Sequence, residues 1–97
     1  MSLNKTYAVF GLGRYGFSVA KELVNSGAEV IAIDNDETRV NLAASELPFC
    51  KCADTTDIEV LKRLGISNVD TVIIAIGENI ESSVMSVMLC KELVNVI

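Results

Sequence analysis

The alternation of apolar runs with helical patterns most constrains how this chain of 97 residues can fold. Each of four short, continuously apolar runs is followed by a segment whose apolar residues recur at helical spacing, and a fifth run comes last. The runs cover residues 7–10, 29–33, 49–53, 70–76 and 95–97. Continuously apolar strands are typical of parallel sheets that are covered on both faces. The pattern therefore predicts one α/β domain over residues 1–97, a doubly wound parallel sheet with helices on both faces.

Turn and capping residues mark where the intervening helices begin and end. We expect helices over residues 15–25, 36–46, 56–64 and 79–93. Gly27 suits the left-handed position that ends the first helix, and Gly65 ends the third. Asp36 is a favourable N-cap for the second helix. Thr56 and Glu59 have the spacing of a capping box at the start of the third helix.

The composition argues against several classes of function. The chain has 13 acidic and 8 basic residues, a net charge of −5, so nonspecific nucleic-acid binding is not expected. It contains no histidine, the commonest general base and metal ligand, and we expect neither a catalytic nor a metal site. No apolar run approaches the roughly 20 residues of a membrane-spanning helix. We therefore expect no direct insertion into a membrane.

The three cysteines are Cys50, Cys52 and Cys90. An odd number of cysteines without secretory features indicates reduced thiols in a cytoplasmic protein. Cys50 and Cys52 lie two residues apart in a predicted strand and would share one face of it. Because no histidine or second cysteine pair completes a metal site, we interpret them as buried apolar thiols.

A glycine-rich motif follows the first predicted strand directly and opens the first predicted helix. Gly11, Gly13 and Gly16 match G-x-G-x-x-G in the strand–helix context that the motif requires. Gly11 would form the tight turn, Gly13 would allow a phosphate close to the backbone, and Gly16 would let the helix pack on the sheet. The helix N-terminus offers N–H groups and a positive dipole end to phosphates. The motif predicts a Rossmann-like sheet with strand order 3-2-1-4-5; a loop kept only for packing is the alternative.

Asp34 ends the second predicted strand at about the 20-residue distance from the glycine motif where an acidic residue accepts hydrogen bonds from a ribose. Its charge would repel a ribose 2′-phosphate. Asn35 and Asp36 follow it without an arginine, so NADP is disfavoured.

Two basic residues are candidates for phosphate contacts. Arg14 lies inside the glycine motif, where a guanidinium can make bidentate contacts with phosphate, although a solvated arginine at a helix start is the alternative. Lys91 lies in the fourth predicted helix, and its position alone indicates a solvated lysine.

The ends of the third and fourth predicted strands reach the same edge of the sheet as the glycine motif. Asp54 and Thr55 would meet a base or its ribose there, or else serve only to cap the next helix. Ile76 and Gly77 would give backbone contacts to the base or ribose, or else form a plain turn.

Five segments carry a resemblance that covers nearly the whole chain. They are VFGLGRYG (residues 9–16), VIAIDND (30–36), ADTTD (53–57), DTVIIAIGE (70–78) and LCKEL (89–93). In this order they are similar to the N-terminal lobe of the KTN/RCK (TrkA-N) family, which regulates potassium channels and transporters. The resemblance implies a cytoplasmic Rossmann lobe that binds ATP, ADP or NAD(H). It also implies dimers, an octameric ring, and a membrane potassium channel or transporter as partner.

The resemblance also assigns ligand-binding positions. It implies phosphate contacts from the glycine motif and Lys91, a ribose contact from Asp34 and base contacts near Asp54. The expected binding residues are Gly11, Leu12, Gly13, Arg14, Tyr15, Gly16, Asp34, Asn35, Asp54, Thr55, Ile76, Gly77 and Lys91. Because the family lobe continues beyond a fifth strand, we expect this chain to be a truncated lobe or an unusually short member of the family.

Three functions remain open on this basis. The first is a regulatory nucleotide-binding domain that gates a potassium channel or transporter. The second is the coenzyme-binding fragment of an NAD-dependent oxidoreductase, which would need a proton donor or acceptor beside the nicotinamide. The third is a dimerisation domain without a ligand. We expect the first, which is not an enzyme.

Overall fold

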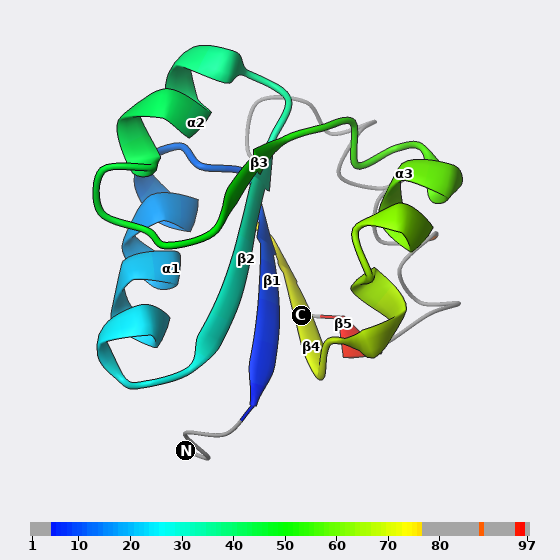
Figure 1. Cartoon of the computed structure of the whole chain (residues 1–97), viewed down its shortest axis with the longest axis horizontal. Helices are drawn as coiled ribbons and strands as arrows, with labels where there is room; N and C mark the ends of the chain where they lie inside the picture. The colour runs from blue at the N-terminus through cyan, green and yellow to red at the C-terminus, as the bar shows by residue number, and fades with distance from the viewer. Residues whose placement is uncertain (1–4, 77–87, 89–94, 97) are drawn as a thin grey trace.

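A parallel sheet forms the middle of the molecule (Figure 1). In the computed structural model of this chain, residues 5–76, 88, 95 and 96 are described. The described strands are β1 (Thr6–Phe10), β2 (Glu29–Asp34), β3 (Cys50–Cys52), β4 (Thr71–Ile74) and β5 (Asn95–Val96). Their order is β3-β2-β1-β4-β5, and every neighbouring pair is parallel. The predicted Rossmann-like strand order is confirmed. The helix expected over residues 79–93 lies outside the described residues.

The register of the strands brings their carboxyl ends to one edge. Phe10, the last residue of β1, lies opposite Ile33 of β2 and Ile74 of β4. Asp34, the last residue of β2, lies opposite Cys52, the last residue of β3. Because the strands are parallel, the segments that follow β1, β2, β3 and β4 all emerge at this edge, where open α/β sheets bind ligands.

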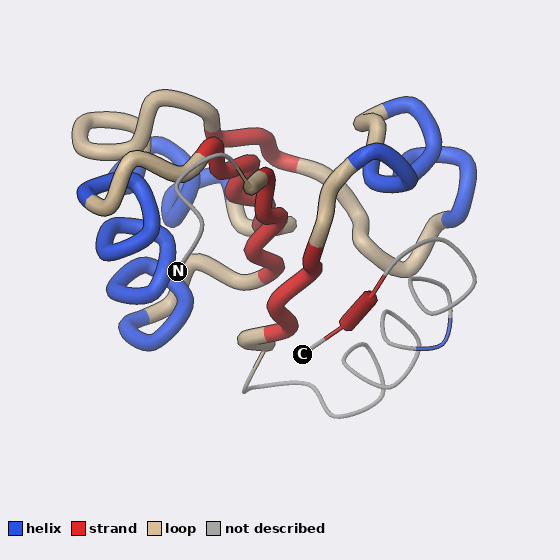
Figure 2. Tube along the Cα trace, turned by 90° about the horizontal axis from the view of Figure 1, so that it is seen from below, coloured by secondary structure: helices blue, strands red, loops and turns tan. Residues whose placement is uncertain are grey.

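Helices cover both faces of the sheet. Helices α1 (Arg14–Asn25) and α2 (Glu37–Ala43) pack on one face. Helix α3 (Ile58–Arg63) and the 3-10 turn after it (Ile66–Asn68) pack on the other. Figures 1 and 2 show the strands between these two layers. The predicted doubly wound arrangement, with helices on both faces, is confirmed.

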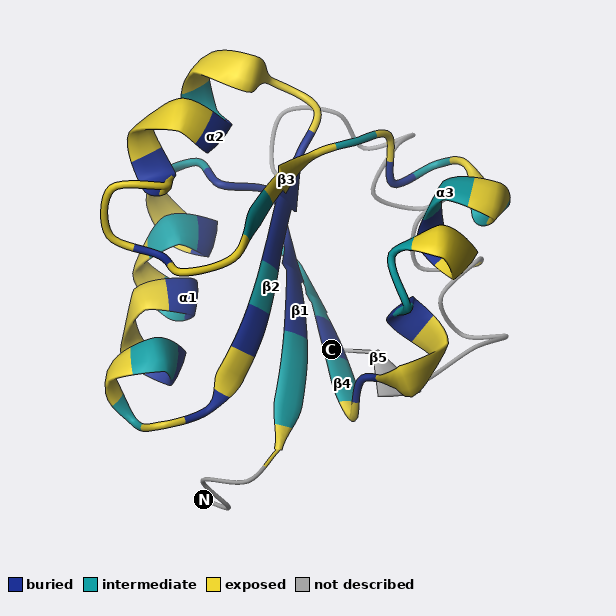
Figure 3. Ribbon diagram, in the orientation of Figure 1, coloured by how far each residue is buried: buried dark blue, intermediate teal, exposed yellow. Residues whose placement is uncertain are grey.

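Successive residues of the central strand β1 belong to two separate apolar layers, one on each face of the sheet. Figure 3 shows the carboxyl-terminal part of β1 as buried. Val9 packs with Leu23 of α1 and Val40 of α2 on one face. Phe10 packs with Leu61 of α3 on the other. Val9, Phe10 and Leu61 are fully buried, and each such side chain contributes about 1.5–3 kcal/mol to folding. Burial on both faces fixes β1, and therefore the loop that follows it.

The second helix is shorter than predicted: α2 ends at Ala43, whereas the prediction extended it to residue 46. The backbone N–H groups of Glu46 and Leu47 both donate to the Ala43 carbonyl, at 3.0 and 2.9 Å. This turn carries Leu47 into the apolar layer beneath α1 and α2, where it is buried. The regular helix therefore ends where two N–H groups share the Ala43 carbonyl, and Leu47 still reaches the apolar layer.

The predicted capping box at the third helix is wrong. The N-cap of α3 is Asp57, whose carboxylate accepts the backbone N–H of Glu59 at 3.0 Å. The Thr56 hydroxyl donates instead to Asp54 Oδ1. Because the Thr56 hydroxyl is hydrogen-bonded to Asp54, the N-cap lies one residue later than predicted, at Asp57. Gly65 ends it as predicted, with a φ of +76°.

The prediction of buried thiols on β3 is also wrong in part. Cys50 is half-buried and packs against the layer beneath α1 and α2, and burial raises the pKa of its thiol. Cys52 is exposed, although its thiol donates to the Asn35 carbonyl at 3.6 Å. Strand β3 is at the edge of the sheet, so its last residue is not covered from both faces.

Candidate functional site

A cavity of about 560 Å³ opens at the carboxyl ends of β1, β2, β3 and β4. Its size is in the range of small-molecule binding sites. Three groups of residues line it: the glycine motif, the end of β2 with the start of α2, and the segments after β3 and β4. The lining residues are Gly11, Gly13, Arg14, Tyr15, Ile33, Asp34, Asn35, Arg39, Asp54, Thr55, Thr56, Ala75 and Ile76.

Two glycines of the motif shape the loop where β1 meets α1. Gly11 has a φ of +98°, and a Cβ atom there would lie 2.6 Å from the Ala75 carbonyl oxygen. A Cβ atom at Gly16 would lie 1.7 Å from the Gly11 carbonyl oxygen. The backbone N–H of Gly11 donates to the Ile33 carbonyl at 2.8 Å and ties the loop to β2. Only glycine permits these approaches, as predicted for the turn and for the packing of the helix.

Gly13 differs from the other two glycines because a Cβ atom there would meet nothing within 4 Å. It is the N-cap of α1 and faces the cavity. Helices α2 and α3 start at aspartates whose carboxylates accept backbone N–H groups, whereas Gly13 provides no such acceptor. The first turn of α1 also lacks acidic residues. The N-terminus of α1 therefore presents backbone N–H groups and a positive dipole end to the cavity.

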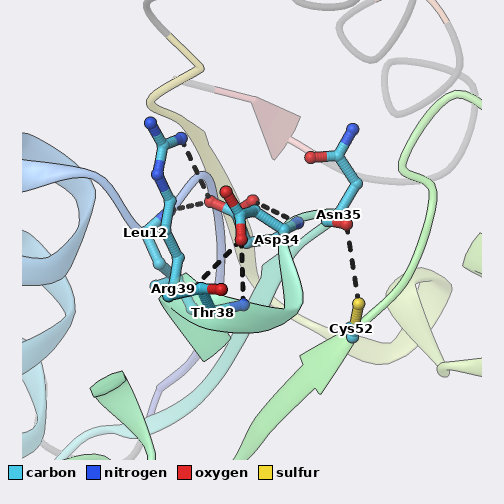
Figure 4. A network of polar contacts seen from close by, with 7 residues as sticks. Leu12, Asp34, Asn35, Thr38, Arg39 and Cys52 are labelled. Carbon is cyan, nitrogen blue, oxygen red and sulfur yellow. Dashed lines mark hydrogen bonds and ion pairs between the residues drawn. The ribbon is translucent and has the colours of Figure 1, made fainter. Parts of the chain in front are cut away.

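Asp34 joins the glycine motif to the start of α2 (Figure 4). Its Oδ2 atom accepts the backbone N–H of Leu12 at 2.7 Å, and its Oδ1 atom accepts that of Asp36 at 2.8 Å. The side chain is only 4% exposed. A carboxylate has about four acceptor positions. Asp34 therefore holds the loop and keeps acceptor capacity for a hydroxyl group in the cavity.

Arg39 is a cavity residue that the sequence reasoning missed. It lies in the first turn of α2, and its Nη1 atom is 3.8 Å from Asp34 Oδ2. The two residues directly after Asp34 are Asn35 and Asp36, whereas Arg39 follows five positions after it. The predicted N-cap at Asp36 could have indicated Arg39. A side chain three positions after an N-cap points back toward the start of the helix, and therefore toward the end of β2.

Asp54 closes the opposite rim of the cavity. Its Oδ1 atom accepts both the hydroxyl and the backbone N–H of Thr56, the latter at 2.8 Å. These hydrogen bonds lower the pKa of the Asp54 carboxyl. Asp54 is exposed, and its neighbour Thr55 is buried. An ionised acceptor therefore stands at the rim, where it can accept a hydrogen bond from an amino or hydroxyl group.

The other predicted residues fall into four groups. Arg14, Tyr15, Asn35 and Ile76 line the cavity, and Arg14, Tyr15 and Asn35 are exposed. Leu12 turns its buried side chain into the layer beneath α1 and α2 and contributes only its backbone N–H. Gly16 supports the loop without lining the cavity. Gly77 and Lys91 lie outside the described residues.

Two features are absent from the described part of the chain. None of its groups of histidine, cysteine, aspartate and glutamate is arranged to hold a metal ion. None of its helices has the length and hydropathy needed to span a membrane.

Comparison with protein families gives a match to the TrkA-N domain over residues 7–97. The chain is 47% identical over 91 residues to the Ktr system potassium uptake protein C of Bacillus subtilis (strain 168). It is also 47% identical over 90 residues to the Ktr system potassium uptake protein A of that organism. These matches cover 94% and 93% of this chain but only 41% and 40% of the relatives. The chain thus spans about two fifths of the length of these relatives.

Solved structures support the fold. The crystal structure of the NAD(P)-binding domain of an exopolyphosphatase-related protein from Archaeoglobus fulgidus has a TM-score of 0.80 to this chain, with 24% sequence identity. The match covers 96% of this chain and 72% of that one. At this identity the similarity establishes a shared Rossmann-like architecture.

Proposed function

This chain belongs to the TrkA-N domain family, and from that premise we propose that it is a regulatory nucleotide-binding domain that gates a potassium channel or transporter. The observation that carries the proposal is the cavity at the carboxyl edge of the sheet, between the glycine motif and Asp34. Relatives that are 47% identical over most of this chain are potassium uptake proteins. The proposed ligand is ATP, ADP or NAD(H).

The phosphates of the ligand would lie at the N-terminus of α1. Gly13 leaves space for them, because a Cβ there would have no atom within 4 Å apart from those of Gly13 and its chain neighbours. The backbone N–H groups of the first helical turn and the exposed Arg14 guanidinium would neutralise their charge. These local positive groups act against the overall net charge of −5.

The nucleoside would extend from the phosphates across the ends of β2 and β3. Asp34 would accept a hydrogen bond from a ribose hydroxyl while it keeps its bonds to the backbone of Leu12 and Asp36. Asp54 and Thr55 would face the base from the segment after β3. We also expect Gly77 and Lys91 to contact the ligand, as the resemblance to the family implies.

Regulation requires that the ligand bind two states of the protein unequally. We propose that the domain is cytoplasmic, self-associates as a dimer or within an octameric ring, and contacts a membrane potassium channel or transporter. Nucleotide exchange would shift the equilibrium between assembly states. The domain would then act by binding and not by catalysis.

Ligand binding is tested by thermal unfolding with ATP, ADP, AMP, NAD and NADH. A ligand at 100 times its Kd stabilises a domain by about 2.7 kcal/mol. We expect a rise in Tm for wild type and a smaller rise for Arg14→Ala. Arg63→Ala is the matched control, because Arg63 is exposed in the last turn of α3 and does not line the cavity. The absence of a shift with every nucleotide would contradict the proposal.

Regulation is tested by light scattering of the wild-type chain with ATP and with ADP. We expect the two ligands to give different distributions of assembly states. Identical distributions, at concentrations where both ligands bind, would retain the binding function and contradict the regulatory one.

A further inference from the structure

Arg39 lines the cavity, but the proposed phosphate and ribose contacts give it no role. It is in the first turn of α2, where Asp36 caps the helix and Oδ1 of Asp36 lies 3.4 Å from the backbone nitrogen of Arg39. Its side chain is 34% exposed, compared with 4% for Asp34. Figure 4 shows the Arg39 side chain extending past the Asp34 carboxylate. The guanidinium is therefore held beside the proposed ribose position and partly open to the cavity.

The contact with Asp34 orients the Arg39 side chain, but it is not the main hydrogen-bonding contact of the Asp34 carboxylate. The carboxylate already accepts two backbone N–H groups, at 2.7 and 2.8 Å. The Nη1–Oδ2 distance of 3.8 Å is longer than a hydrogen bond. Attraction between the charges limits where the guanidinium can lie. Because the side chain lines the cavity and is 34% exposed, a ligand in the cavity can contact it.

We propose that Arg39 is a specificity-determining residue that stacks its guanidinium plane on the base of the bound nucleotide. The inference rests on the proposed function, because it takes the ribose to lie at Asp34. A base attached to that ribose would lie beside the start of α2, between Arg39 and the segment that carries Asp54 and Thr55. Guanidinium groups stack on aromatic faces, and purines present a larger face than pyrimidines. The expected ligand is therefore a purine nucleotide.

A second role for an arginine beside a ribose is contact with a 2′-phosphate, as in NADP. The structure disfavours this role because the buried Asp34 carboxylate lies 3.8 Å from the guanidinium and would repel a phosphate placed between them. Stacking brings no negative charge toward Asp34. We therefore treat 2′-phosphate recognition as an alternative outcome of the experiment.

The experiment compares Arg39→Ala, Arg39→Lys and the control Arg63→Ala with wild type. Calorimetric titrations with AMP, ADP, ATP and CTP report affinity and base preference, and titrations with NAD and NADP report contact with a 2′-phosphate. Arg39→Ala should weaken AMP, ADP and ATP by the same factor, about fivefold to thirtyfold. The loss should be smaller for CTP, so that the preference for ATP over CTP falls. Arg63→Ala should match wild type.

Arg39→Lys separates stacking from charge. Lysine keeps a positive charge near Asp34, so this variant should fold like wild type, but it has no planar group. We expect its nucleotide affinities to fall nearly as far as those of Arg39→Ala. Wild-type affinities in Arg39→Lys would overturn the stacking role and leave a charge role only.

Two further outcomes would overturn the inference. Unchanged affinities in Arg39→Ala would remove Arg39 from the site while the proposed nucleotide function stands. A loss confined to NADP, with NAD unaffected, would assign Arg39 to a 2′-phosphate. Failure of wild type to bind any nucleotide would instead refute the proposed function itself, and is distinguishable because no variant is needed to observe it.

Discussion

Alanine substitutions at Gly13 and Gly16 should separate the two tasks of the glycine motif, which are folding and binding. The two residues are three positions apart, yet their surroundings differ sharply. A Cβ atom at Gly16 would lie 1.7 Å from the Gly11 carbonyl oxygen and 3.2 Å from the Cβ atom of Ala75. At Gly13 it would meet nothing within 4 Å. The same added methyl group therefore has opposite consequences at the two sites.

The magnitudes follow from these distances. Non-bonded carbon atoms approach to about 3.5 Å, so Gly16→Ala must push α1 well away from the loop. Overpacking typically costs 1–3 kcal/mol, and the backbone clash here indicates about 3 kcal/mol or more. For a chain of this size that lowers Tm by roughly 12–24 °C. Gly13 has a φ of −71°, which alanine adopts readily, so Gly13→Ala should cost no more than about 1 kcal/mol, mainly because alanine is a poor N-cap.

The ligand response should follow the reverse order. The Cβ atom of Gly13→Ala would occupy the space proposed for the phosphates, so the ligand-induced rise in Tm should largely disappear although the variant folds. Thermal unfolding followed by circular dichroism, with and without ATP, measures both quantities. A Gly13→Ala variant as unstable as Gly16→Ala would refute the reasoning about packing. A Gly13→Ala variant with the full response to ATP would refute the placement of the phosphates.

Two further predictions concern a titratable group and the core. Hydrogen bonds from Thr56 lower the pKa of the Asp54 carboxyl in the folded state. The ionised carboxylate therefore stabilises the fold at pH values above the unfolded pKa of about 3.8. This stabilisation is lost as the pH falls through the lower pKa of the folded state. Asp54→Asn should therefore reduce the free energy of unfolding near neutral pH by less than about 1 kcal/mol. Urea titrations at several pH values should show the difference between variant and wild type disappear in acid. A difference that grows in acid would contradict the sign of this pKa shift. Leu61→Ala should lower the free energy of unfolding by about 3 kcal/mol, because Leu61 is fully buried between α3 and the sheet. Leu42→Ala is the control and should change it by less than about 0.5 kcal/mol, because Leu42 is 71% exposed. Equal urea midpoints for the two variants would contradict the assigned core.

The order of the elements could be read from the sequence because the signals are local. Apolar runs, helical spacing and the glycine motif each depend on residues close together in the chain, and together they restrict the sheet to a few topologies. The positions of Gly11, Gly13 and Asp34 followed from the same reasoning, since strand ends in a parallel sheet lie at one edge. The ends of two helices differ from the prediction. Helix α2 ends early, where the N–H groups of Glu46 and Leu47 share the Ala43 carbonyl. Asp57 replaces Thr56 as the cap of α3, because Asp54 engages Thr56.

The sequence by itself determined that this chain forms an open parallel α/β sheet with a glycine loop and a carboxylate at one edge. Only the tertiary structure decided what those residues touch. Asp34 holds the backbone N–H of Leu12 from 22 positions away, and Arg39 reaches the same carboxylate from α2. These contacts depend on crossovers that bring β1 and β2 side by side and start α2 above their ends. Local patterns fix which elements form, whereas the position of a side chain over a cavity depends on how distant elements pack.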